Sequence, residues 1–162
     1  MTGGEKLVVC DSRQAMEAHR DLFHLNEEAY SVTEEKGFFS SITGLLSFLN
    51  AQTQLAPPRI HLVLGWENLI LLALWKEGLP SWTELSPLLT ASGIRGDELA
   101  PLKGSDTADL FPWLYYGKRF DILRKVCHKA KKQVEEHLTD RAIRVDCHLF
   151  ADYARMIVAS SL

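Results

Sequence analysis

The fold depends on the segment Ile143-Arg144-Val145-Asp146-Cys147-His148-Leu149. Apolar and polar residues alternate along it, and a period of two is typical of a β-strand. The segment also fits a helix, because apolar residues recur at spacings of four and three. These residues are Ile143, Cys147, Phe150, Ala154 and Ile157. We favour a strand over residues 142–149, followed by a helix from about Ala151.

Two earlier segments, 6–10 and 59–64, are short and rich in β-branched and other apolar residues, so we predict strands there as well. Between the three strands, apolar residues recur at helical spacing. Helices are expected within 15–29, 38–49, 66–75, 81–92 and 119–138. The alternation predicts a helix-dominated α/β fold with a small parallel sheet of about three strands. A helix at 142–149 would instead make the chain nearly all-α.

Length and composition describe an ordinary globular protein. The chain has 162 residues, of which 46% are hydrophobic and 24% charged, and its formal net charge is −3. We therefore expect residues 1–162 to form a single soluble domain. The longest apolar run, 69–75, is too short to cross a membrane, which needs about 20 helical residues. Three cysteines without close spacing favour a reducing compartment, so we expect a cytoplasmic protein without a membrane partner.

Three carboxylates follow the predicted strands. Asp11 comes directly after the first strand, Glu67 shortly after the second, and Asp152 near the end of the third. In open parallel sheets, ligands bind outside the carboxyl ends of the strands. Carboxylates that meet there could hold Mg²⁺ and support phosphoryl transfer, as in a nuclease. The alternative is structural: Asp11 caps a helix, and Glu67 lies in a first helical turn, where acids are favoured.

The cysteines and histidines give no zinc pattern. Cys127-His128 and Cys147-His148 are adjacent pairs, and adjacent side chains point in different directions on a helix or strand. We therefore expect no metal site from these pairs. Together with Cys10, the two cysteines are expected to be small core residues.

The charge distribution is the most unusual feature of the sequence. Residues 118–132 contain seven basic residues and one acidic residue. The candidate binding residues of this predicted helix are Arg119, Arg124, Lys125, His128, Lys129 and Lys132. Such a basic face attracts an acidic protein surface or nucleic acid, and the aromatic residues at 113–116 could add base stacking. The alternative is an ordinary solvated helix face.

Three hypotheses for function follow from these features. The first is a non-catalytic interaction or regulatory domain whose basic helix, at about 119–132, contacts an acidic partner. The second is a small Mg²⁺-dependent phosphoryl-transfer enzyme or nuclease that uses Asp11, Glu67 and Asp152. The third is a nucleic-acid-binding subunit that uses the same basic face. The sequence leaves open whether the chain is an enzyme and whether it forms a homo-oligomer.

Overall fold

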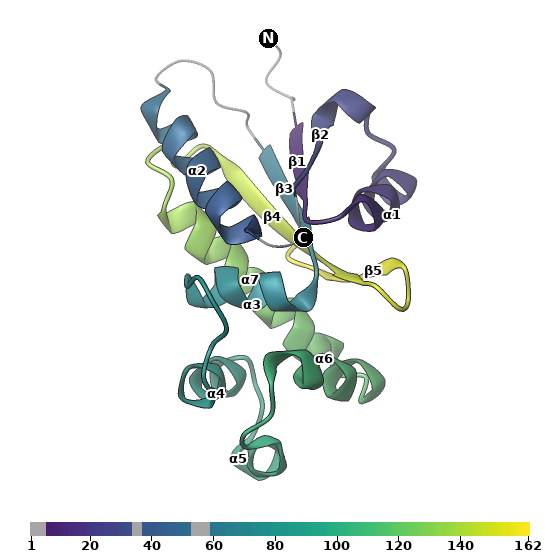
Figure 1. Ribbon diagram of the computed structural model, residues 1–162, viewed down its shortest axis with the longest axis vertical. Helices are drawn as coiled ribbons and strands as arrows, with labels where there is room; N and C mark the ends of the chain where they lie inside the picture. Colours follow the sequence, from purple (N-terminus) through teal and green to yellow (C-terminus); the bar gives the residue numbers. More distant parts are fainter. Residues whose placement is uncertain (1–5, 34–36, 53–58) are drawn as a thin grey trace.

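A five-stranded mixed sheet lies at the centre of the computed structural model, which describes residues 6–33, 37–52 and 59–162 (Figure 1). The strands are β1 (Lys6–Cys10), β2 (Tyr30–Val32), β3 (Arg59–Leu64), β4 (Arg144–Ala151) and β5 (Met156–Ser160). Their order in the sheet is β2-β1-β3-β4-β5. The first four strands are parallel, and β5 is antiparallel to β4.

The helices are α1 (Arg13–Phe23), α2 (Phe38–Ala51), α3 (Trp66–Leu74), α4 (Trp82–Ala91), α5 (Gly96–Leu99), α6 (Thr107–Tyr116) and α7 (Phe120–Glu136). Two short 3-10 helices, η1 (Glu27–Ala29) and η2 (Ala100–Leu102), complete the elements of the described residues. The α/β, helix-dominated prediction is confirmed, although the sheet has more strands than the expected three. None of the helices in the described ranges is long and apolar enough to cross a membrane.

The strand interpretation of residues 142–149 is confirmed by β4, but the helix expected from about Ala151 is wrong. The chain instead turns at 152–155 and returns as β5. Arg155 closes this turn with a φ of 51° in the left-handed region, and its backbone N–H donates to the carbonyl oxygen of Asp152 at 3.2 Å. The β-branched pair Ile157-Val158 then favours the extended conformation.

Each face of the sheet packs against a different set of helices. One hydrophobic cluster joins Val9, Leu62 and Leu149 to α2, α3 and α7. The other, smaller cluster joins Val8, Val63 and neighbouring strand residues to α1. Successive strand residues point to opposite faces of the sheet, and helices cover both faces. The residues of β3 and β4 are therefore buried on both faces of the sheet.

The three cysteines lie in the core, and side-chain hydrogen bonds cap the N-termini of α1 and α4. Cys10, Cys127 and Cys147 are free and buried, which confirms the expectation of small core residues. Ser81 and Glu84 form the reciprocal hydrogen bonds of a capping box at the start of α4. The cap of α1 differs from the prediction, because the Ser12 hydroxyl, and not Asp11, accepts from the backbone N–H of Ala15.

Candidate functional site

The three predicted carboxylates lie at the carboxyl edge of adjacent strands. Asp11 directly follows β1, Asp152 directly follows β4, and Glu67 lies in the first turn of α3, two residues beyond Gly65 at the end of β3. Strands β1, β3 and β4 are parallel neighbours, so their carboxyl ends meet at one edge. The fold thus brings residues from three distant parts of the sequence to the same end of the sheet.

Asp11 is held firmly in place at this edge. Its Oδ2 atom accepts hydrogen bonds from the backbone N–H of Gly65 and from the side-chain amide of Asn68, each at 2.8 Å. The residue is 4% exposed, and this burial raises the pKa of its carboxyl group, while the bonds from Asn68 and Gly65 oppose the shift. Asp11 therefore joins β1 to the N-terminus of α3, and both of these bonds end on its Oδ2 atom.

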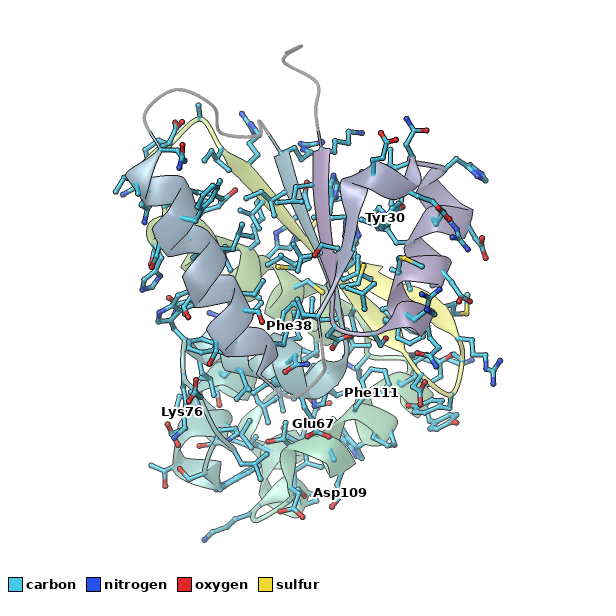
Figure 2. The ribbon with its side chains drawn as sticks, turned by 45° about the horizontal axis from the view of Figure 1, so that its top comes forward. Tyr30, Phe38, Glu67, Lys76, Asp109 and Phe111 are labelled. Atoms are coloured by element: carbon cyan, nitrogen blue, oxygen red, sulfur yellow. The ribbon has the colours of Figure 1, made fainter. Side chains whose placement is uncertain are left out.

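Glu67 and Asp152 line a shared pocket of about 170 Å³. Gly65, Asn68 and Tyr153 also line it, so the two groups that hold Asp11 form part of its wall. A second pocket of about 580 Å³ lies on the other side of Glu67 and Asn68, between α2, α3 and Thr107. Figure 2 shows Glu67 near Phe111, with Asp109 farther out on α6.

The carboxylates do not form a closed cage. Among the residues that the structure describes, Asp11, Glu67 and Asp152 are not part of any group of three ligand atoms that lie within 4.8 Å of one another. This spacing does not suit a tight protein cage, but it is compatible with Mg²⁺, which keeps several waters and binds through one or two carboxylates plus substrate phosphate.

Tyr153 lines the smaller pocket and contacts aromatic side chains of α6. Tyr153 stacks on Tyr116 with ring centroids 6.0 Å apart and an interplanar angle of 10°. Tyr116 is 70% exposed, and Tyr115 and Phe111 also contact Tyr153. The sequence indicated the aromatic segment of α6, but it did not indicate that Tyr153 joins it beside Asp152.

The predicted basic face of α7 is present, with one exception. Arg124, Lys125, His128 and Lys132 are exposed, Lys129 is half-buried, and the inner side of the helix packs in the core. Within the described ranges, none of the basic residues 124, 125, 129 and 132 forms an ion pair with a carboxylate.

Arg119 differs from the other candidate binding residues. Its guanidinium forms ion pairs with Asp121 and Glu98, and the hydrogen bond to Asp121 raises the pKa of Arg119. Two of the free cations, Lys129 and Lys132, line a pocket of about 340 Å³ between α3, α4 and α7, together with Glu84 and Glu136. The basic face therefore consists of Arg124, Lys125, His128, Lys129 and Lys132.

The sequence did not reveal two residues of the carboxyl edge. Asn68 lies in the first turn of α3 and donates a hydrogen bond to Asp11. Tyr153 lines the pocket next to Asp152. Asn68 follows Gly65 by three residues, a spacing that places it in the first turn of the helix after β3. That position is the one signal in the sequence that points to it.

Comparisons of the chain with family models, curated proteins and solved structures give no match. The fold and the edge together define a class: an open, mostly parallel α/β sheet with carboxylates at the carboxyl ends of its strands. Function is therefore inferred from the geometry of the site.

Proposed function

We propose that the protein is a metal-dependent phosphoryl-transfer enzyme that acts on phosphate esters at the carboxyl edge of the sheet. The observation that supports this proposal is that Glu67 and Asp152 line one pocket at this edge, and that Gly65 and Asn68, which hold Asp11, form part of its wall. Oxygen ligands of this kind suit Mg²⁺, which when bound neutralises phosphate charge and activates a water molecule.

The residues of the edge have separable roles in this proposal. Asp11 is fixed by Gly65 and Asn68, so it can hold a cation without losing side-chain entropy on binding. Glu67 and Asp152 are exposed and line the pocket, so both can bind the same cation. A volume of about 170 Å³ fits a phosphoryl group and its cation, and leaves the rest of the substrate outside.

The aromatic rim favours a nucleotide-containing substrate. Tyr116 and Tyr153 expose their rings beside the pocket, and base-aromatic stacking contributes about 1–3 kcal/mol per base. A single-stranded nucleic acid could place one phosphate in the pocket while a neighbouring base stacks on Tyr116. We therefore assign single-stranded phosphodiesters as the substrate class.

The first prediction concerns Glu67, whose exposed side chain can be changed without disturbing the core. We expect the Glu67→Gln variant to lose at least about 100-fold in the rate of Mg²⁺-dependent hydrolysis, because about 2.7 kcal/mol of transition-state stabilisation is lost. Hydrolysis of bis(p-nitrophenyl) phosphate and of a short single-stranded oligonucleotide, with Mg²⁺ or with excess chelator, measures this rate.

The control is Asp97→Asn, which removes an exposed carboxylate on α5 and should retain the full rate. Asp11→Asn should lose as much activity as Glu67→Gln, although it can also weaken the hydrogen bonds with Gly65 and Asn68. Absence of hydrolysis by the wild-type protein with Mg²⁺ and with Mn²⁺ would contradict the proposal, and so would a rate that is unchanged in Glu67→Gln.

A second candidate function rests on the basic face of α7. Its four arginine and lysine residues, Arg124, Lys125, Lys129 and Lys132, present positive charge without described carboxylate partners, as expected for a surface that contacts an acidic protein. In this case the protein is a non-catalytic interaction domain. Nucleic acid is the other anionic partner that the same face could contact.

The second prediction tests this face by charge reversal. We expect Lys125→Glu combined with Lys129→Glu to weaken binding to polyglutamate at least tenfold, because two attractive charges become repulsive. Fluorescence anisotropy with labelled polyglutamate and with a labelled oligonucleotide, over a range of salt concentrations, measures the effect. The exposed pair Arg13→Glu and Lys103→Glu is the matched control and should bind normally. Equal losses in both double variants would indicate net charge alone and contradict a role for this face.

A further inference from the structure

Three histidines meet in the buried layer between α1 and the sheet. His19 projects from α1, His61 from β3 and His148 from β4, and their exposed fractions are 0%, 4% and 0%. Their ring centroids form a nearly equilateral triangle with sides of 5.1, 5.2 and 5.5 Å. One ring nitrogen from each residue lies within 4.8 Å of the other two.

We propose that His19, His61 and His148 form a binding site for a divalent first-row transition metal, with Zn²⁺ as the ion that best fits three imidazoles. Three histidines are an established protein ligand set for zinc, with Zn–N bonds of about 2.0–2.1 Å. A tetrahedral ion with such bonds holds its ligand nitrogens about 3.4 Å apart. Small rotations of rings that already lie within 4.8 Å can reach that spacing.

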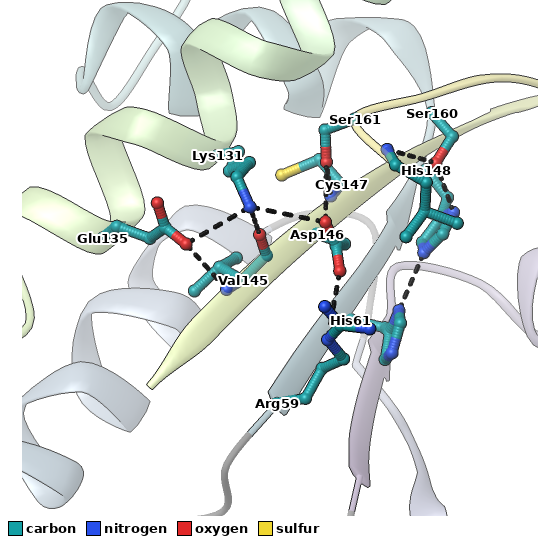
Figure 3. A network of polar contacts seen from close by, with 11 residues as sticks. Arg59, His61, Lys131, Glu135, Val145, Asp146, Cys147, His148, Ser160 and Ser161 are labelled. Carbon is teal, nitrogen blue, oxygen red and sulfur yellow. Dashed lines mark hydrogen bonds and ion pairs between the residues drawn. The ribbon is translucent and has the colours of Figure 1, made fainter. Parts of the chain in front are cut away.

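The hydrogen bonds around the rings leave nitrogen atoms for a metal. The Tyr30 hydroxyl lies 2.7 Å from Nδ1 of His19, and the Ser160 hydroxyl lies 3.0 Å from Nδ1 of His148. Metal-bound histidines usually hydrogen-bond through their second ring nitrogen, which fixes the ring and its tautomer. Tyr30 and Ser160 are in position for that role, and each contacts Nδ1 and not the Nε2 atom of its histidine. Figure 3 shows the contact between His148 and Ser160.

Unpaired nitrogens provide the second observation. Within the described part of the chain, the Nε2 atoms of His19 and His61 are buried without a hydrogen-bond partner. An unpaired buried polar atom costs about 1–3 kcal/mol, so two of them in one cluster require an explanation. Nε2 of His148 at present lies 2.9 Å from Nδ1 of His61, and a metal bound to Nε2 of His148 would replace that hydrogen bond.

The surroundings keep the three histidine rings neutral, which is the form that binds a metal ion. Burial lowers the pKa of His19 and His61 to about 4 and that of His148 to about 3, so all three rings are unprotonated at neutral pH. Phe23 stacks on His19 with ring centroids 4.4 Å apart and covers the cluster from α1. Soft or borderline ions fit this nitrogen-rich, apolar site, whereas Mg²⁺ prefers the oxygen ligands of the carboxyl edge.

The third prediction is therefore one zinc ion per chain. The full chain is treated with a chelator, desalted and incubated with ZnCl₂, and the bound zinc is measured by mass spectrometry of the metal after gel filtration. We expect His61→Gln and His148→Gln each to weaken zinc binding at least about 100-fold, since one of three ligands is lost. His128→Gln, which removes an exposed histidine of α7, should bind zinc with unchanged affinity.

Tyr30→Phe keeps all three ligands and separates metal binding from folding. It should reduce zinc affinity about 10–100-fold, as expected when the partner of a ligating histidine is lost. Wild-type protein loaded with Co²⁺ should show the visible absorption of a tetrahedral site. Wild-type protein without bound zinc would overturn the proposal, and so would unchanged affinity in both His61→Gln and His148→Gln. Glu67→Gln should bind zinc normally, so this result is independent of the proposed hydrolytic activity.

Discussion

The metal-free protein is expected to unfold steeply as the pH falls from 6.5 to 4, because His19, His61 and His148 are buried in the neutral form. Burial lowers the pKa of two of these rings to about 4 and of the third to about 3, from an ordinary value of 6.5. The unfolded chain therefore binds more protons than the native chain in this interval, and stability is lost as the pH falls.

The size of the effect follows from the shifts. Each histidine removes about 3 kcal/mol by pH 4, since one pKa unit corresponds to 1.36 kcal/mol. Together the three groups remove about 9 kcal/mol, comparable with the whole stability of a typical domain of about 5–15 kcal/mol. Burial raises the pKa of Asp11, so that residue acts in the opposite direction, but through a single group.

Urea unfolding in the presence of a chelator, at several pH values between 7.5 and 4.5, measures this dependence. We expect a slope of about 4 kcal/mol per pH unit near pH 5, where each native histidine lacks one proton that the unfolded state carries. His148→Gln should reduce the slope to about two thirds of that value, and His128→Gln should leave it unchanged. A wild-type slope below about 1 kcal/mol per pH unit would show that the cluster is already protonated or open to water.

The histidine cluster shows where the sequence is least informative. The period of two in residues 143–149 predicts the strand correctly, because each apolar residue faces the α2–α3–α7 side of the sheet. The same pattern is typical of a strand with one face in water, yet Asp146 and His148 are both buried. His148 contacts His61, which is 87 residues away in the sequence, and His19 of α1, and no local pattern records these contacts.

The second missed feature is the hairpin after β4. Its tight turn places Arg155 in the left-handed conformation, which glycine and asparagine usually mark in a sequence. Without such a marker, the spacing of Ala154 and Ile157 favoured a helix. Strand β2 was missed for a related reason, since its three residues, Tyr30–Val32, are too few to show a period.

The carboxyl edge was easier to predict, because it depends only on the direction of the strands and on which residues follow them. Parallel strands place their carboxyl ends together, so Asp11 and Asp152 could be assigned to one edge from their positions after β1 and β4. The hydrogen bonds from Gly65 and Asn68 to Asp11 could not be predicted, since they depend on the rotamer of each side chain.

Asp146 is expected to be the most sensitive charged residue of the fold. Its carboxylate is buried in β4, where Oδ2 lies 3.4 Å from Nε of Arg59, and Oδ1 lies 3.5 Å from Nζ of Lys131 (Figure 3). The Ser161 hydroxyl donates to Oδ1 at 3.4 Å. One carboxylate therefore connects β3, α7 and the segment after β5.

We expect Asp146→Ala to lower the free energy of unfolding by about 3 kcal/mol, since two partly buried cations lose the charge that compensates them. Asp146→Asn keeps an acceptor for Ser161 and Lys131, so about half of that loss should remain. Asp97→Ala, which breaks an exposed pair with Arg95, is the matched control and should cost less than about 0.5 kcal/mol.

Urea unfolding at pH 7.5 measures these differences, and one further variant separates charge from packing. Asp146→Leu combined with Lys131→Met replaces the interaction with apolar groups and should recover part of the stability that Asp146→Ala loses, because no cation of α7 is left without its partner. Equal losses in Asp146→Ala and Asp97→Ala would show that solvent compensates Arg59 and Lys131.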